Sequence, residues 1–186
     1  MNNIILILPL FPLLVAKVRK NRLSFFIYSI YALVLIIFIG FRAASPAGDL
    51  LNYFYRFIEF HQSSNWLNLY WENLGVGFSF ALISHFFDDY ETLIFVYSLI
   101  PISLFAIILW KQTNRPFFAL FLLLSLFYYQ YAIEQYRQFV ALAFAMWALF
   151  ETDKIKQIII IFLASLFHPT ALIVLVIFLT ILKIHT

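Results

Sequence analysis

The 186-residue chain contains no cysteine, which excludes disulfide bonds and thiol chemistry but leaves the compartment open. Charge is also scarce, because Asp, Glu, Lys and Arg together make up 11% of the residues while hydrophobic residues make up 65%. A soluble domain of this size cannot cover its surface with so few polar groups. The composition therefore predicts a membrane protein.

The sequence also lacks the signatures of several kinds of functional site. The histidines and carboxylates show no compact ligand spacing, so neither a metal nor another cofactor is predicted. No basic face with spaced aromatic residues is present, which argues against a nucleic-acid partner. The apolar runs are apolar on every face, unlike the alternating strands of a transmembrane β-barrel. We therefore predict an all-α fold with one integral membrane domain, residues 1–186, forming a polytopic transmembrane helical bundle of about six to seven spans.

Apolar runs of helical length recur along the chain, at residues 3–16, 23–40, 74–87, 91–110, 117–133, 139–150 and 155–184. The first run is short for a span of about 20 residues, so it is expected to extend into the basic segment that follows. A cleaved signal peptide would carry its positive charge before the apolar run rather than after it. The run at 74–87 has only about 14 residues, which is typical of a re-entrant or interfacial segment.

The charges predict an orientation in the membrane. If 74–87 does not cross, eight of the twelve Lys and Arg residues fall on one side, at positions 17, 19, 20, 22, 111, 115, 154 and 156. Seven of the nine acidic residues then fall on the other side, at positions 49, 59, 72, 88, 89, 91 and 134. The positive-inside rule makes the basic side cytoplasmic and places the N-terminus on the outer side of the membrane.

The stretch Glu134-Gln135-Tyr136-Arg137-Gln138 lies between two apolar runs. If it were helical, Gln130, Glu134 and Arg137 would share one face, which Gln138 would extend. Charged groups at bilayer depth usually face a bundle interior or a wet cavity. The alternative is a solvated polar turn at the membrane surface. No Gly or Pro marks a hairpin between 117 and 150, so one long tilted helix is a second possibility, but the charge distribution favours the hairpin.

Two further features are polar. Residues 41–73 form the longest polar stretch, and its dense aromatic residues suit a membrane interface or, as the less favoured reading, stacking on sugar rings. His168-Pro169 interrupts the last apolar run, because proline removes a helix hydrogen bond and disfavours helix at the preceding residue. An ionisable residue at such a break is typical of a cavity lining, although a proline kink with a histidine bonded to a freed carbonyl is the simpler alternative.

Together, short motifs in a fixed order resemble the EpsG family: Gly40-Phe41-Arg42, Gly48-Asp49, Asn52-Tyr53, Glu72 with Gly77-Phe78, Arg137-Gln138 with Ala141, and Phe167-His168-Pro169-Thr170-Ala171-Leu172. These are multi-pass membrane proteins of bacterial exopolysaccharide and O-antigen clusters, related to Wzy-type polymerases. The resemblance covers about residues 3–182. Leu50 departs from the usual aromatic, and the gap from Glu72 to Gly77 is longer than usual. Family members continue with more spans, so the chain is expected to be the N-terminal portion of a longer fold or a short form.

The resemblance implies a glycosyltransferase or polysaccharide polymerase at the outer face of the bacterial plasma (inner) membrane, in exopolysaccharide, capsule or O-antigen biosynthesis. Its partners would be a polyprenyl-diphosphate-linked oligosaccharide, the lipid bilayer and other polysaccharide-assembly proteins. Arg42 and Arg137 would bind the departing diphosphate through forked hydrogen bonds. Asp49, Glu72 or His168 would act as general base, and Tyr53 and Gln138 would bind substrate.

Two alternative functions belong to other classes of protein. A transporter or flippase component would also explain intramembrane charges and a broken helix, but it should show inverted repeats, and none is visible. A non-catalytic subunit of the same polysaccharide machinery is the other alternative.

Overall fold

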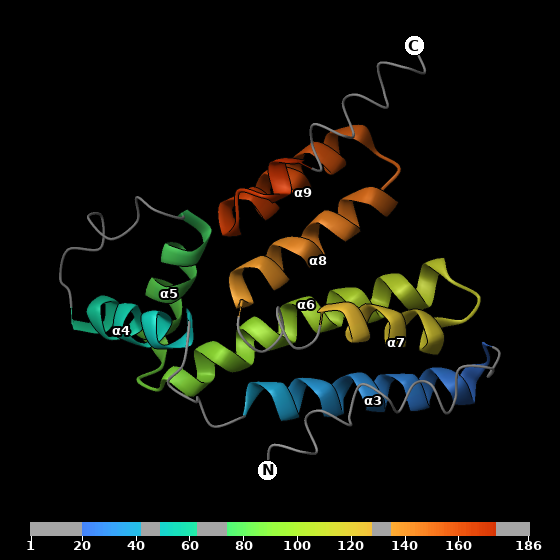
Figure 1. Ribbon diagram of the computed structural model, residues 1–186, viewed down its shortest axis with the longest axis horizontal. Helices are drawn as coiled ribbons and strands as arrows, with labels where there is room; N and C mark the ends of the chain where they lie inside the picture. Colours follow the sequence, from blue (N-terminus) through green and yellow to red (C-terminus); the bar gives the residue numbers. More distant parts are fainter. Residues whose placement is uncertain (1–19, 42–48, 63–73, 128–134, 174–186) are drawn as a thin grey trace.

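The computed structural model describes residues 20–41, 49–62, 74–127 and 135–173, and every regular element in these ranges is an α-helix (Figure 1). The described helices are α3 (Arg22–Gly40), α4 (Asp49–Gln62), α5 (Leu74–Phe86), α6 (Tyr90–Gln112), α7 (Pro116–Phe127), α8 (Tyr136–Phe150) and α9 (Lys154–Phe167). The predicted all-α class is confirmed over these ranges. The predicted first span, residues 3–16, lies outside them.

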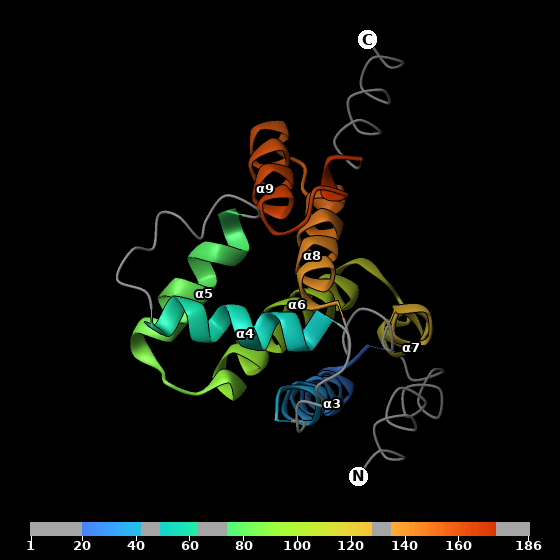
Figure 2. The ribbon, with the colours of Figure 1, turned by 60° about the vertical axis from the view of Figure 1, so that its left-hand side comes forward.

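Helix α6 is the centre of the arrangement. Helices α3 and α7 run beside it, and α8 packs on it from another side, paired with α9 (Figures 1 and 2). Helices α4 and α5 gather around the first turns of α6, at the left in Figure 1. The polar site described below is built where these two helices meet α6, α8 and α9.

Polar side chains set where the helices begin. Asn21 and Ser24 form a reciprocal capping box at the start of α3, with hydrogen bonds of 2.7 and 2.8 Å. Asp89 caps α6 through the backbone N–H of Thr92 at 2.7 Å, and Asp153 caps α9 in the same way. A further hydrogen bond, from the Thr92 side chain, lowers the pKa of Asp89 below its usual value.

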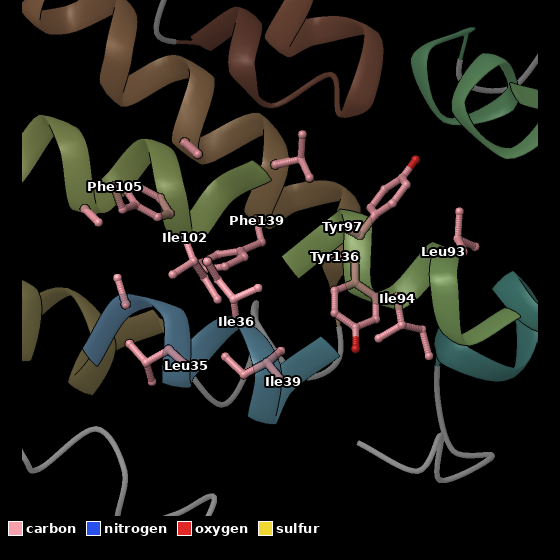
Figure 3. Packing of buried hydrophobic residues seen from close by; sticks show 14 of the residues in the cluster. Leu35, Ile36, Ile39, Leu93, Ile94, Tyr97, Ile102, Phe105, Tyr136 and Phe139 are labelled. Atoms are coloured by element: carbon pink, nitrogen blue, oxygen red, sulfur yellow. The ribbon is translucent and has the colours of Figure 1, made fainter. Parts of the chain in front are cut away.

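Apolar side chains fill the space between α3, α6 and α8. Leu35 and Ile39 of α3, Phe105 of α6 and Phe139 of α8 are almost fully buried and face one another (Figure 3). The outward faces are apolar too, and the exposed side chains on α3 and α9 include Leu23, Phe26, Leu33, Ile155, Ile159 and Phe162. Water would disfavour such a surface, whereas lipid would not.

Two described helices, α3 with 19 residues and α6 with 23, are long and apolar enough to cross a membrane. They match the runs predicted at 23–40 and 91–110. Helices α5 and α8 and the segment Pro116–Ser125 are apolar but shorter, so the total of six to seven spans stays a prediction. The 13 residues of α5 rise about 20 Å, which is short of a hydrocarbon core of about 30 Å and supports the re-entrant or interfacial prediction.

The structure decides one alternative that the sequence left open and adds one helix that was not predicted. Gln135 has a non-helical backbone (φ −118°, ψ 62°), so α7 and α8 are separate helices and the single long helix is excluded. For the same reason, a helical face shared by Gln130, Glu134 and Arg137 does not continue across Gln135. In addition, residues 49–62 form α4, for which the polar stretch gave no prediction. Its buried Tyr53, Phe57 and Phe60 recur at helical spacing on one face, a signal that was present in the sequence.

Lys20 and Lys111 lie together at one end of the bundle. The ammonium group of Lys20, just before α3, lies 3.5 Å from the carbonyl oxygen of Lys111 at the end of α6, and 5.7 Å from the ring centroid of Trp110. The turn between α8 and α9, which precedes Lys154 and Lys156, faces the same end in Figure 1. This grouping is what a cytoplasmic face requires.

Single-cysteine labelling tests that orientation, and the chain has no native cysteine to interfere. Gln62→Cys and Asn114→Cys both introduce a thiol at an exposed position, near opposite ends of α6. We expect a membrane-impermeant maleimide to label Gln62→Cys in intact spheroplasts and Asn114→Cys only after permeabilisation. The opposite pattern would reverse the orientation.

Candidate functional site

Arg137 lies in the first turn of α8 and is held by a residue 84 positions earlier. Its Nε donates a hydrogen bond to the Tyr53 hydroxyl at 2.8 Å, and its guanidinium carbon lies 5.2 Å from the Tyr53 ring centroid. Tyr53 is itself buried on α4. Within the described part of the chain, no carboxylate and no hydrogen-bond partner meets the two terminal nitrogens of Arg137. Tyr53 therefore orients the guanidinium of Arg137, and the fork formed by its two terminal nitrogens remains able to bind an anion.

A small pocket surrounds the guanidinium. It is lined by aromatic and aliphatic side chains with Arg137 as its cation: Tyr53, Phe80, Tyr90, Leu93, Ile94, Tyr97, Tyr136 and Arg137. The free space is about 10 Å³, of the order of one water molecule, so a sugar ring does not fit inside it. The pocket thus anchors the arginine, and a larger ligand has to lie at its mouth.

A second polar cluster forms at the break after α9. The Nε2 atoms of Gln138 and His168 lie 3.2 Å apart, and the other ring nitrogen of His168, Nδ1, lies 2.7 Å from the Thr170 hydroxyl. Helix α9 ends at Phe167, as predicted from Pro169, and residues 171–173 are helical again. Because Gln138 follows Arg137 on α8, the two clusters are adjacent along the chain.

Tyr97 of α6 connects the two clusters. Its ring packs edge-on against Tyr136 and Phe167, the residues that precede Arg137 and His168, with centroid distances of 6.5 and 6.3 Å. Its hydroxyl is hydrogen-bonded to Ser79 of α5. Figure 3 shows the hydroxyl groups of Tyr97 and Tyr136 pointing in opposite directions from this contact. The site is therefore assembled from α4, α5, α6, α8 and the end of α9.

The structure brings together four of the predicted site residues, as the pairs Tyr53 with Arg137 and Gln138 with His168. Asp49 begins α4, one helical turn before Tyr53, but its side chain is not described. Arg42 and Glu72 lie outside the described residues.

Sequence reasoning missed two residues of the site. Tyr97 lies inside an apolar run, so nothing in the sequence distinguished it from core aromatics. Thr170 was part of a motif but was given no role. Among the described residues, no three His, Asp or Glu side chains come close enough to hold a metal ion.

These features define an α-helical membrane protein with an arginine-centred aromatic site next to a proline-broken helix. The EpsG family model matches residues 25–186, so the chain belongs to the EpsG family. Comparison with curated proteins and with solved structures found no match. Family membership indicates a membrane protein of the polysaccharide-polymerase type.

Tyr53→Phe tests whether Tyr53 positions Arg137. The variant keeps the ring under the guanidinium but removes the acceptor for Nε, and one such hydrogen bond contributes about 1.5–3 kcal/mol. We expect the yield of long-chain polysaccharide to fall roughly tenfold. Tyr55→Phe, an exposed position on the same helix, is the matched control and should leave it unchanged. Equal yields from both variants would mean that the contact has no role in function.

Proposed function

We propose that this protein transfers a glycan from a polyprenyl diphosphate to a sugar hydroxyl of a second lipid-linked repeat unit, at the outer face of the plasma membrane. The observation that carries the proposal is the guanidinium of Arg137, oriented by Tyr53 at the edge of an aromatic pocket with two terminal nitrogens left to donate. A diphosphate is the anion that matches such a fork, because its oxygens accept two parallel hydrogen bonds.

The chemistry needs a base and a cation. The acceptor hydroxyl attacks the anomeric carbon, its proton passes to a general base, and the bond from that carbon to the diphosphate breaks. Asp49, Glu72 and His168 are the predicted candidates for the base. Polyprenyl diphosphate leaves with additional negative charge, which Arg137, together with the predicted Arg42, stabilises. Such stabilisation is strong where apolar side chains exclude water.

The position of the site suits a lipid-linked substrate. The pocket lies where α4 and α5 gather around the start of α6, at the opposite end of α6 from Lys20 and Lys111. If the basic end is cytoplasmic, the site faces outward, where a flipped lipid-linked unit arrives. The bilayer would hold the polyprenyl chain, and other polysaccharide-assembly proteins would supply the repeat units.

A component of a flippase, or a non-catalytic subunit, is the second candidate. The helix break at His168 favours it, because broken helices also occur in transporters. The two functions differ in what accumulates when the protein is lost.

Deleting the gene in a host with the matching polysaccharide cluster separates them. We expect surface glycans of a single repeat unit, because a polymerase acts after synthesis and flipping. A flippase defect would instead trap lipid-linked units on the cytoplasmic face. The measurement is a gel of surface polysaccharide, with the intact gene supplied in trans as the control. An unchanged ladder of long chains would contradict the polymerase proposal.

A further inference from the structure

Helix α4 is too short and too polar to cross a membrane. Its 14 residues rise about 21 Å, less than a hydrocarbon core of about 30 Å, and they include Asp49, Arg56 and Glu59. Figure 2 looks nearly along α3, one of the two helices long enough to span, and shows α4 lengthwise. Helix α4 therefore lies across the direction of the spans.

The level of α4 is that of the beginning of α6. The rings of Phe54 and Phe57 contact the ring of Tyr90, the first residue of α6, with centroid distances of 5.4 and 5.9 Å. Because α6 is long enough to cross a membrane, Tyr90 would lie near one membrane–water interface, at the end of α6 opposite Lys111. A helix that lies across a span at this level has the position of an interfacial helix.

Apolar side chains lie on two different sides of α4. One side is buried against the bundle and carries Tyr53, Phe57 and Phe60. The other side carries an apolar stripe that recurs at i, i+3 and i+7: Leu51, Phe54 and Ile58. Leu51 and Ile58 are half-buried, and Phe54 is 40% exposed, so the bundle covers this stripe only in part.

A polar stripe occupies a third side of α4. It recurs at i, i+7 and i+10, and all three of its residues are exposed: Asn52, Glu59 and Gln62. A helix at the surface of a soluble protein needs only a buried side and a wet side. The membrane interface offers water and hydrocarbon next to each other, which matches a polar stripe beside a partly exposed apolar one.

We propose that α4 is an interfacial helix of the bilayer. Its apolar stripe inserts among the acyl chains of the leaflet at that end of the bundle, and its polar stripe faces water. The partner of this surface is therefore lipid rather than another protein chain.

The lipid contact also bears on the candidate site. Tyr53, on the buried side of α4, accepts the hydrogen bond from Arg137 Nε at 2.8 Å. Lipid that holds α4 in the interface keeps Tyr53, and with it the guanidinium of Arg137, at the level of the headgroups. The diphosphate of a polyprenyl-linked substrate lies at the same level. This part of the inference rests on the proposed function.

Nitroxide labels on single cysteines test the placement, with the full chain in lipid nanodiscs. Phe54→Cys and Ile58→Cys probe the apolar stripe, and Glu59→Cys and Gln62→Cys probe the polar stripe. Molecular oxygen concentrates in hydrocarbon, whereas a nickel chelate stays in water. We expect oxygen to relax the labels at positions 54 and 58 more strongly, and the nickel chelate to relax those at 59 and 62 more strongly.

Two results of this measurement would overturn the proposal. Labels at 54 and 58 that respond mainly to the nickel chelate would place the apolar stripe in water. Labels there that respond to neither reagent would mean that protein, such as a second copy of the chain, covers the stripe. Neither result depends on the reaction that the protein catalyses.

Phe54→Asn tests whether the lipid contact supports the site. It replaces a partly exposed ring with a polar amide, so we expect long-chain polysaccharide to fall about fivefold at equal membrane levels, while Phe54→Leu stays within about twofold. Glu59→Gln, on the polar stripe, is the control and should leave the yield unchanged. A normal yield from Phe54→Asn would overturn the link between lipid and site. If Arg137→Lys also leaves the polysaccharide unchanged, the proposed function has failed, and the spin labels alone decide the placement of α4.

Discussion

Arg137→Lys is expected to remove most long-chain polysaccharide, although it conserves the charge. Lysine carries a single ammonium group, so it cannot donate sideways to the Tyr53 hydroxyl and still present two parallel donors to a diphosphate. Each charge-assisted hydrogen bond lost costs about 1.5–3 kcal/mol, so losing two predicts a reduction of at least about a hundredfold. The measurement is the polysaccharide ladder made by the variant in a strain that lacks the native gene.

Arg22→Lys is the matched control, because Arg22 is exposed in the first turn of α3, at the end of the bundle where Lys20 contacts the carbonyl oxygen of Lys111. We expect it to leave the ladder unchanged. The amount of folded protein in the membrane has to be equal for the two variants, which fluorescence-detected gel filtration reports. A normal ladder from Arg137→Lys would reduce Arg137 to a structural partner of Tyr53 and remove the main support for the polymerase proposal.

Gly75→Ala is expected to displace α5 from α9 and to lower the stability of the folded protein. A Cβ at position 75 would lie 2.9 Å from the backbone carbonyl of Leu166, closer than real Cβ contacts allow, and backbone cannot rotate out of the way. Helix propensity alone would favour alanine by about 1 kcal/mol, so a loss of stability has to come from the clash. Overpacking of this kind costs about 1–3 kcal/mol.

A displaced α5 is also expected to disturb the candidate site, because α5 carries Ser79, the hydrogen-bond partner of Tyr97. We expect Gly75→Ala to lower both the melting temperature in detergent and the yield of long-chain polysaccharide. Phe78→Ala, on the exposed face of the same helix, is the control and should change the melting temperature little. Unchanged melting of Gly75→Ala would show that α5 can shift away from Leu166 without loss.

Much of this protein was determined by local sequence. The apolar runs predicted α3 and α6 to within two residues at each end, because a span must be both long and apolar. Pro169 predicted the end of α9, because a proline cannot continue the helix that precedes it. The motif order predicted the family, and Arg137, Gln138 and His168 were singled out because polar groups are costly among apolar helices.

Only the tertiary structure decided which of these residues meet. Tyr53 and Arg137 are 84 residues apart, and their contact depends on α4 folding against the start of α6. The sequence did not distinguish Tyr97 from the other aromatic residues of its apolar run. Its hydroxyl finds a hydrogen-bond partner only because α5 packs beside α6 and places Ser79 next to it. Local patterns are set by backbone geometry and burial, whereas the partner of a buried polar group depends on how whole helices pack.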